Sequence, residues 1–156
     1  LQQVARNEQI QLIPMIEEIF TDLAPLAEKR SITLEAEGDG SLTGSDTLIY
    51  RLLFNLTENA VKYNRPGGSV RVTVAKEPEK LLIRVSDTGC GISKEECGKV
   101  FKRFYRADTS RNLPGNGLGL AMVQAVAVAH GGFVVLDSTA GKGSSFTVHF
   151  PKNAER

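Results

Sequence analysis

Two amide side chains and one ammonium group recur at helical spacing in the middle of this sequence. Asn55, Asn59 and Lys62 are four and three positions apart, so an α-helix would place them on one face. Amide oxygens can bind a hard cation such as Mg²⁺, and a lysine ammonium group neutralises phosphate charge. Taken alone, these three residues fit a solvated polar face of a helix better than a ligand site.

A loop with two glycines, DTGCGI at residues 87–92, follows a segment that alternates like a strand. Gly89 and Gly91 allow the backbone to turn sharply and to approach a flat ligand. Asp87, at the end of the strand, can accept a hydrogen bond from an exocyclic amine such as that of adenine. An ordinary turn has a similar composition, so the loop alone leaves both interpretations open.

A second glycine-rich segment, GNGLGL at residues 115–120, stands directly before a helical pattern. Free backbone N–H groups and the positive end of the helix dipole would then lie beside a loop that permits close approach, which suits a phosphate. Glycine also serves bare turns, so this pattern is weak by itself. The glycines of residues 141–143 indicate a hairpin turn.

A basic and aromatic segment at residues 101–111 precedes the second glycine motif. Phe101 and Phe104 are expected to be core residues with a solvated basic rim around them. Arg106 is different, because a flexible loop can carry its guanidinium group onto a phosphate.

Helices are expected at four places. Apolar residues at three- and four-residue steps predict a helix over residues 13–29, which Pro25 should kink or end early. A second helix, capped by Ser45 or Asp46, ends near Asn64 and carries the amide residues. A short helix begins at Ser93, and a further helix covers residues 118–130.

Period-two alternation predicts the strands that complete the frame. The Gly38-Asp39-Gly40 turn suggests a hairpin between strands at residues 31–37 and 41–44. A turn that contains Pro78 suggests a second hairpin, between strands at residues 70–74 and 81–85. Two further strands are expected at residues 133–136 and 145–150.

The composition describes one globular domain. A chain of 156 residues, 41% of them hydrophobic, is long enough for a single core. Its formal net charge of +1 creates no overall field that would attract nucleic acid or an anionic membrane. The longest apolar stretch, residues 118–129, is too short to span a bilayer. Cys90 and Cys97 match neither a zinc site nor a disulfide framework and are expected to be inert thiols.

The order of the motifs resembles the catalytic domain of sensor histidine kinases, over roughly residues 9–151. The matching segments are NLTENAVKYN at 55–64, DTGCGI at 87–92, VFKRFYR at 100–106, GNGLGLAMV at 115–123 and GKGSSF at 141–146. They resemble the asparagine box, the first glycine box, the phenylalanine box, the second glycine box and the last glycine turn of that family.

The resemblance implies a Bergerat-type ATP-binding fold, an α/β two-layer sandwich with a mixed, mostly antiparallel sheet packed on three helices. It also implies ATP and Mg²⁺ as cofactors, with Asn59 as the Mg²⁺ ligand and Asp87 as the adenine-reading carboxylate. Residues from about 106 to 115 would form the ATP lid. The catalytic residues implied are Asn59, Lys62 and Arg106. The ATP-binding residues implied are Asn55, Asn59, Lys62, Tyr63, Asp87, Gly89, Gly91, Ile92, Tyr105, Arg106, Gly115, Gly117, Leu118, Gly119 and Leu120.

One position departs from the wider superfamily, whose gyrase, mismatch-repair and chaperone members carry a water-activating glutamate where Asn55 stands. An amide cannot act as a general base, so phosphate transfer to an external nucleophile is favoured over hydrolysis. Glu58 lies about 100° around the helix from Asn59. The acceptor histidine of the family is also absent, because His130 and His149 follow structural patterns.

The resulting hypothesis is a cytoplasmic protein-histidine kinase domain whose acceptor histidine lies in a dimerisation hairpin outside this sequence. Residues 1–8 would be the remnant of that hairpin, residues 9–151 the catalytic domain and residues 152–156 a tail. The expected partners are the hairpin and, through the full kinase, a response regulator, with no nucleic acid and no direct membrane contact. The resemblance leaves open that the full-length protein is tethered to the inner membrane, and the isolated domain is expected to be a monomer. The alternatives are a degenerate module that binds nucleotide or a partner without transfer, and a serine kinase or ATPase of the superfamily.

Overall fold

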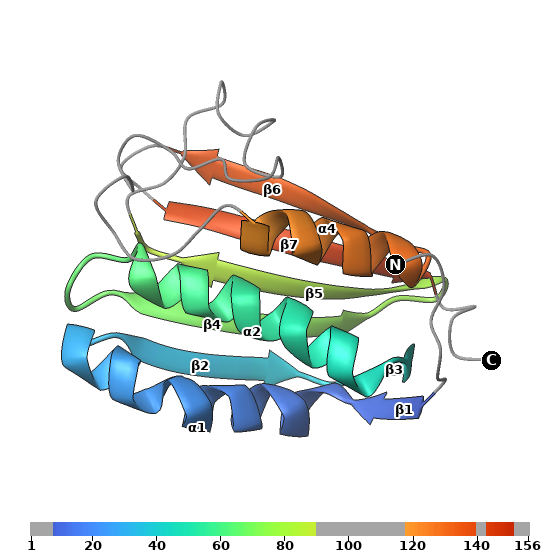
Figure 1. The fold of residues 1–156 in the computed structure, drawn as a ribbon, viewed down its shortest axis with the longest axis horizontal. Coiled ribbons are helices and arrows are strands. Elements are labelled where there is room, and N and C mark those ends of the chain that lie inside the picture. The colour runs from blue at the N-terminus through green and yellow to red at the C-terminus, as the bar shows by residue number, and fades with distance from the viewer. Residues whose placement is uncertain (1–7, 90–117, 140–142, 152–156) are drawn as a thin grey trace.

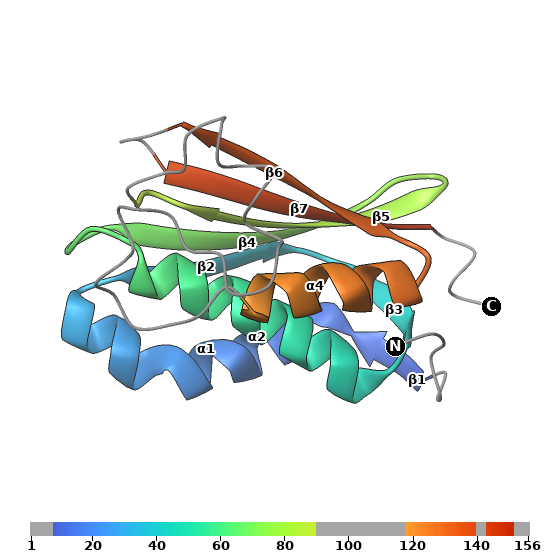
Figure 2. The same ribbon diagram turned by 45° about the horizontal axis from the view of Figure 1, so that its top comes forward.

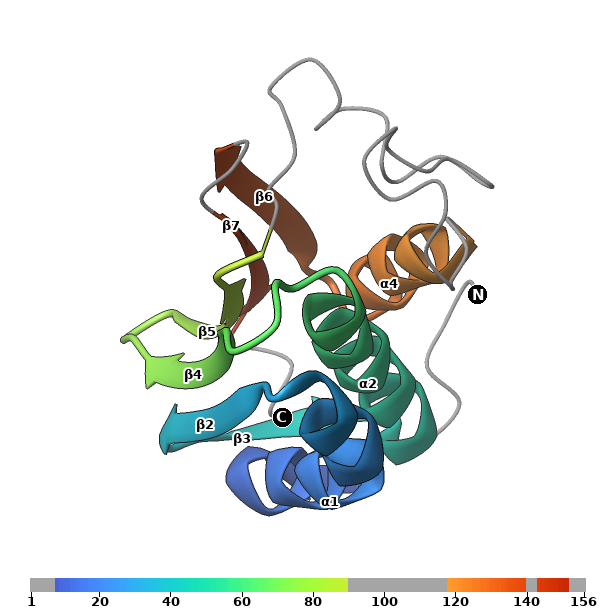
Figure 3. The same ribbon diagram turned by 90° about the vertical axis from the view of Figure 1, so that its left-hand side faces the viewer.

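The computed structural model describes residues 8–89, 118–139 and 143–151. Its helices and strands form two layers, with the five-stranded sheet on one side and α1, α2 and α4 on the other (Figure 3). The helices are α1 (Leu12–Arg30), α2 (Asp46–Lys62) and α4 (Leu118–Ala129). This arrangement confirms the expected two-layer sandwich.

The main sheet is mixed and mostly antiparallel. Its strands lie in the order β2-β4-β5-β7-β6, and only the β2–β4 pair is parallel (Figure 1). A separate two-stranded sheet pairs β1 with β3. The strands are β1 (Glu8–Gln11), β2 (Thr33–Gly38), β3 (Ser41–Gly44), β4 (Ser69–Lys76), β5 (Lys80–Asp87), β6 (Phe133–Thr139) and β7 (Gly143–Pro151).

The expectation of a hairpin between residues 31–37 and 41–44 is wrong. Both strands form, but β2 pairs with β4 and β3 pairs with β1, where Leu42 lies opposite Ile10. Gly38 has φ +105° and lies so close to the backbone of Val74 that an added Cβ would be 1.9 Å from its carbonyl oxygen. The glycine therefore permits close pairing with β4 instead of a tight turn into β3. The second expected hairpin, β4 with β5, is confirmed.

Pro25 does not end the first helix early, which was one of the two effects expected of it, the other being a kink. α1 continues past it to Arg30. Proline costs about 3 kcal/mol in a helix interior. The turn after Pro25 offsets part of this cost, because Ala27 is buried and Arg30 donates hydrogen bonds to the carbonyl oxygens of Val61 and Asn64 at 3.1 and 2.6 Å.

α2 begins and ends with specific hydrogen bonds. Ser45 is its N-cap, as expected, and its hydroxyl accepts from the backbone N–H of Leu48 at 3.3 Å. At the other end, the guanidinium group of Arg30 satisfies two terminal carbonyls and opposes the negative end of the helix dipole. The ends of the helix that carries Asn55, Asn59 and Lys62 are therefore defined from both sides.

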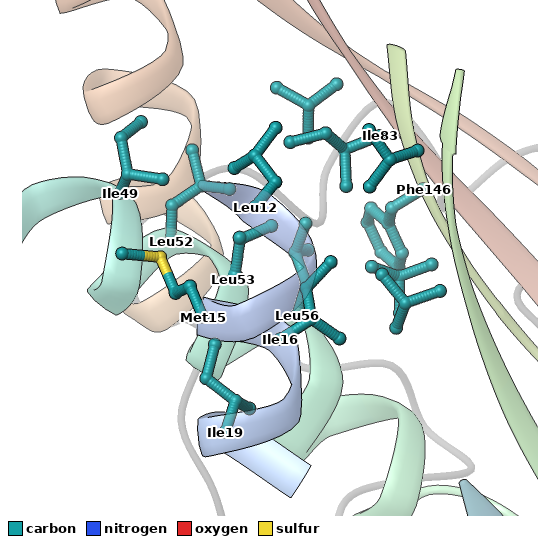
Figure 4. Close-up of a cluster of buried hydrophobic side chains, with 14 of the residues drawn as sticks. Leu12, Met15, Ile16, Ile19, Ile49, Leu52, Leu53, Leu56, Ile83 and Phe146 are labelled. Carbon is teal, nitrogen blue, oxygen red and sulfur yellow. The ribbon is translucent and has the colours of Figure 1, made fainter. Parts of the chain in front are cut away.

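The core lies between the helical layer and the sheet (Figures 2 and 4). Leu12, Ile16 and Ile19 of α1 and Leu52 and Leu56 of α2 are almost completely buried there. Ile83 and Phe146 extend the core from β5 and β7. Burial of this apolar area is the main stabilising contribution to the frame that positions the site. Within the described part of the chain, no helix is both long and apolar enough to cross a bilayer.

Candidate functional site

Three element ends point toward the same side of the molecule (Figure 1). The C-terminal end of α2, the end of β5 and the N-terminal end of α4 all lie toward the left side of Figure 1. These ends carry the residues of the asparagine segment, the first glycine loop and the last residues of the second glycine segment. The fold therefore brings to one side three motifs that are far apart in the sequence.

The side chains of Asn55, Asn59 and Lys62 are all half-buried on α2. The amide nitrogen of Asn55 donates to the carbonyl oxygen of Arg51 at 2.8 Å. Lys62 Nζ lies 3.6 Å from a carboxylate oxygen of Glu58, one turn earlier. The side chain of Asn59 has no hydrogen-bond partner among the residues that the structure describes.

Asp87 is the last residue of β5, and its carboxylate is half-buried. Oδ1 accepts from the backbone N–H of Gly89 at 2.8 Å and from that of Ser144 at 3.3 Å. Burial raises the pKa of Asp87 above its ordinary value, while these hydrogen bonds from Gly89 and Ser144 oppose the rise. The carboxylate is thus oriented by backbone groups, yet its charge carries a desolvation cost.

Gly89 packs against the end of α2. A Cβ added there would lie 2.5 Å from the carbonyl oxygen of Tyr63 and 3.0 Å from Oδ1 of Asp87. Only glycine allows the first glycine loop to approach the asparagine helix this closely. Tyr63 itself is the C-cap of α2, and its N–H donates to the carbonyl oxygen of Asn59. The first glycine motif therefore has a packing role beyond that of a simple turn.

A polar network that sequence reasoning missed connects α2 to this loop. Asn64 is buried, and its Oδ1 accepts from Thr88 Oγ1 at 3.0 Å and from the backbone N–H of Arg65 at 2.9 Å. Its Nδ2 donates to the carbonyl oxygen of Ser69 at 2.9 Å. The signal available in the sequence was a polar residue between an apolar helix and the Pro66-Gly67-Gly68 turn. Ser144 was also missed as a donor to Asp87.

Several expected site residues lie outside the described part of the chain, as do the expected Ser93 helix and the basic and aromatic segment. They are Gly91, Ile92, Tyr105, Arg106, Gly115 and Gly117. Leu118 and Gly119 begin α4, and Leu120 packs against the core while half-buried. The structure therefore brings Asp87 and Gly89 close to the end of α2, and it does not describe Arg106.

Both histidines occupy positions away from these residues. His130 is buried, and its Nε2 accepts from the backbone N–H of Ser45 at 3.1 Å while Nδ1 lies 2.9 Å from the carbonyl oxygen of Val126. His149 stacks on Phe133 with ring centroids 4.4 Å apart, and burial lowers its pKa. The structural role expected for His130 is confirmed, and the packing of His149 agrees with the same expectation.

The described residues also form a pocket away from this site. A surface pocket of about 630 Å³ lies at the opposite end of α2, between β1 and the first turns of α1 and α2. Ile10, Met15 and Tyr50 are among the residues that line it. No group of three His, Cys, Asp or Glu side chains that could hold a metal occurs within the described ranges.

A family model described as "Histidine kinase-, DNA gyrase B-, and HSP90-like ATPase" matches residues 44–154. This match includes α2, β5 and α4, and thus every element that carries the candidate site. The chain belongs to this family of ATP-binding domains.

Within the family, the chain has relatives that are sensor histidine kinases. The chain is 37% identical to sensor histidine kinase RppB of Synechocystis sp. over 142 residues, which cover 90% of the chain and 31% of RppB. It is 44% identical to sensor histidine kinase WalK of Bacillus subtilis over 112 residues, which cover 69% of the chain and 18% of WalK. The chain is therefore a catalytic domain of the histidine kinase type, and it spans about a third or less of these relatives.

Solved structures have the same fold. The mycobacterial sensor histidine kinase MprB matches with a TM-score of 0.79 and 28% identity, covering 93% of this chain and 97% of that one. Histidine kinase ThkA, solved in complex with the response regulator protein TrrA, matches with a TM-score of 0.79 and 23% identity. That match covers 96% of this chain and 43% of ThkA, and at this identity it shows the fold alone.

Proposed function

We propose that this domain binds ATP together with Mg²⁺ and transfers the γ-phosphate to a histidine on a dimerisation segment outside the chain. The observation that carries the proposal is the half-buried carboxylate of Asp87, which Gly89 and Ser144 orient beside the last residues of α2. A carboxylate in such a position accepts a hydrogen bond from the exocyclic amine of adenine. Gly89 provides the close approach that a flat base needs.

Asn59 is suited to Mg²⁺. Its amide oxygen is a hard donor, the side chain is half-buried, and none of the described residues hydrogen-bonds to it. When bound, the cation would neutralise charge on the β- and γ-phosphates. With no acidic cluster among the described residues, the remaining ligands would be phosphate oxygens and water.

Lys62 and Arg106 would supply positive charge to the phosphates. Lys62 stands one turn after Glu58, and their ion pair at 3.6 Å is weak enough for the ammonium group to exchange onto a triphosphate. In the transfer, the bond from the γ-phosphorus to the bridging oxygen of ADP breaks, and a bond to the imidazole nitrogen forms. The domain contributes by positioning and charge neutralisation, which dominate catalysis of this reaction.

Hydrolysis of ATP is a second candidate reaction, and one position of α2 argues against it. Asn55 stands where the ATPases of the superfamily have a glutamate, and its amide nitrogen donates to Arg51. Glu58 lies about 100° around the helix from Asn59, and its carboxylate pairs with Lys62. Neither residue is arranged as a general base for water, so transfer to an external nucleophile is favoured.

The partners follow from this reaction. A preceding dimerisation hairpin would present the histidine, and a response regulator would receive the phosphate, as the complex of ThkA with TrrA suggests for kinases of this fold. We place the catalytic domain at residues 9–151, with residues 1–8 leading from the hairpin and 152–156 as a tail. The domain would work in the cytoplasm and be a monomer when separated from the hairpin.

A transfer assay tests this proposal. The chain is mixed with a separately produced dimerisation hairpin, γ-labelled ATP and Mg²⁺, and acid-labile, base-stable label on the hairpin is measured. We expect label on the histidine of the hairpin. The initial rate of labelling should fall at least tenfold for Asn59→Ala and should be unchanged for the surface variant Arg71→Met. Nucleotide binding without labelling would support the degenerate binding module, and free phosphate as the main product would support an ATPase.

A further inference from the structure

The guanidinium group of Arg65 contacts the start of the first glycine loop. Nε donates to the carbonyl oxygen of Thr88 at 2.7 Å, and Nη2 donates to that of Gly89 at 3.2 Å. Two consecutive carbonyls of the loop are thus bound by one planar, charged group. Arg65 follows α2 by three residues, so it connects the asparagine helix to the loop after β5.

The contact matters because of the peptide unit that it fixes. The peptide between Thr88 and Gly89 has its C=O bound by Arg65 and its N–H donated to Oδ1 of Asp87 at 2.8 Å. Rotation of this peptide would break both hydrogen bonds at once. Glycine at position 89 places little restriction on such a rotation, since it tolerates both signs of φ. Without Arg65, the N–H that orients Asp87 would therefore be free to turn away.

The backbone that carries Arg65 is itself well defined. Asn64 is 4% exposed and bonds to Thr88 Oγ1, which in turn accepts from the backbone N–H of Ser69 at 2.9 Å. A Cβ at Gly68 would lie 2.3 Å from Asn64 Oδ1, so this turn has room only for glycine. The base of the Arg65 side chain is therefore fixed with respect to β4 and to Thr88.

We propose that Arg65 is a positioning residue for recognition of the base: it fixes the Thr88–Gly89 peptide so that Asp87 faces the exocyclic amine of adenine. This inference rests on the proposed function. Arg65 acts through the loop and Asp87, so its loss lowers the preference for adenine over a purine that lacks the amine. Affinity for the triphosphate portion of the nucleotide stays nearly unchanged.

The test compares two nucleotides on the intact chain by calorimetric titration in the presence of Mg²⁺. One is a non-hydrolysable ATP analogue, and the other is the same analogue with unsubstituted purine as its base. We expect Arg65→Met to weaken binding of the adenine analogue by about 5- to 20-fold. Binding of the purine analogue should change by less than about twofold. Arg65→Lys, whose ammonium group reaches only one carbonyl, should lie between parent and Arg65→Met.

A matched control and a double variant separate this role from a purely structural one. Arg71→Met removes an arginine that pairs with Glu35 and Glu37 and should leave both affinities unchanged. In an Asp87→Asn background, Arg65→Met should cause no further loss of preference for adenine.

The outcomes are distinct. Equal weakening of both analogues by Arg65→Met, or an unchanged preference in both Arg65 variants, would overturn the inference while leaving ATP binding intact. A parent chain that binds neither analogue would instead overturn the proposed function. Because Arg65→Lys retains the charge, it decides the question if Arg65→Met does not fold.

Discussion

The two ends of α2 differ in how their polar groups are satisfied. At the first turn, Ser45 caps the helix, and its N–H donates to His130, whose other ring nitrogen lies against Val126. At the last turns, Asn59 has no side-chain partner within the described ranges, and the nearby carboxylate of Asp87 has a raised pKa because it is half-buried. Among the described residues, Ser45 and His130 at the first end have hydrogen-bond partners, whereas the side chain of Asn59 at the second end has none.

This difference separates residues that stabilise the fold from candidate ligand-binding residues without reference to any motif. Buried polar groups that have internal partners stabilise a fold, whereas groups that remain costly or without a partner are candidates for ligand binding. Substitutions at the first end should therefore lower stability and leave nucleotide affinity nearly unchanged. Substitutions at the second end should lower affinity and have a smaller or opposite effect on stability.

The largest effect is expected at the first end. His130→Ala removes the acceptor of the Ser45 N–H and opens a cavity beside Phe150, so it should lower the free energy of unfolding by about 2 to 5 kcal/mol. Urea unfolding measures the loss, and nucleotide affinity well below the midpoint should change by less than about threefold. His149→Gln is the control, because His149 Nδ1 is buried with no hydrogen-bond partner in the described part of the chain, so that its replacement should lower the free energy of unfolding less. Equal losses for both histidines would contradict the assigned role of His130.

Gly89→Ala should affect both properties. The new methyl group would meet the carbonyl oxygen of Tyr63 at 2.5 Å, which forces the loop away from α2 and costs about 1 to 3 kcal/mol of stability. Affinity for the ATP analogue should fall at least tenfold, since Asp87 moves with the loop. Gly67→Ala is a matched control from the neighbouring turn, where the positive φ costs about 1 kcal/mol but no atom obstructs the methyl group. Similar affinities for both variants would argue against close packing of the loop as the reason for Gly89.

Asp87 predicts a pH dependence of known sign. Because burial raises its folded pKa, the cost of its charge is present above that pKa and disappears as the pH falls through it. Asp87→Asn should therefore leave the melting temperature at pH 7 unchanged or raise it. Affinity for the ATP analogue should fall as the pH drops through the pKa of Asp87, because the protonated carboxyl group is a poorer hydrogen-bond acceptor. Since this pKa is raised, the fall should occur at a higher pH than for an ordinary aspartate. A parent whose affinity follows the same pH profile as Asp87→Asn would contradict this account.

The smallest effect is expected for Glu58→Gln. The ion pair of Glu58 with Lys62 is partly exposed, and pairs of this kind contribute about 0.3 to 0.5 kcal/mol. Stability should change by no more than that amount, and the slow release of free phosphate from ATP should not decrease. Fluorescence-monitored unfolding and a phosphate-release assay check both points. A large fall in phosphate release would identify Glu58 as a general base and favour an ATPase.

Much of this fold could be predicted from sequence because the elements repeat with clear periods. The stripe Leu52, Leu56 and Ala60 defines α2, and the alternation in β4 and β5 defines their hairpin. Strand pairing was less predictable, since the partner of β2 lies in β4, more than thirty residues away, and depends on the glycine at position 38. The continuation of α1 past Pro25 likewise depends on contacts that Arg30 makes with α2.

The site was predicted unevenly for a similar reason. Asp87 and Asn59 could be proposed from the sequence because their residue types can bind a base and a cation directly. Asn64, Arg65 and Ser144 were missed because they act on backbone groups of other segments, and such contacts leave no local pattern. Residues that orient a ligand-binding group are visible only after the fold has brought the segments together.

The central claim is that Asp87 at the end of β5 reads the base of ATP. Calorimetric titration of the parent chain and Asp87→Asn with a non-hydrolysable ATP analogue and Mg²⁺ tests it most directly. We predict that the parent binds and that the variant, although folded, binds about 5- to 150-fold more weakly, which corresponds to about 1 to 3 kcal/mol. Equal affinity of the two proteins for the analogue would contradict the claim.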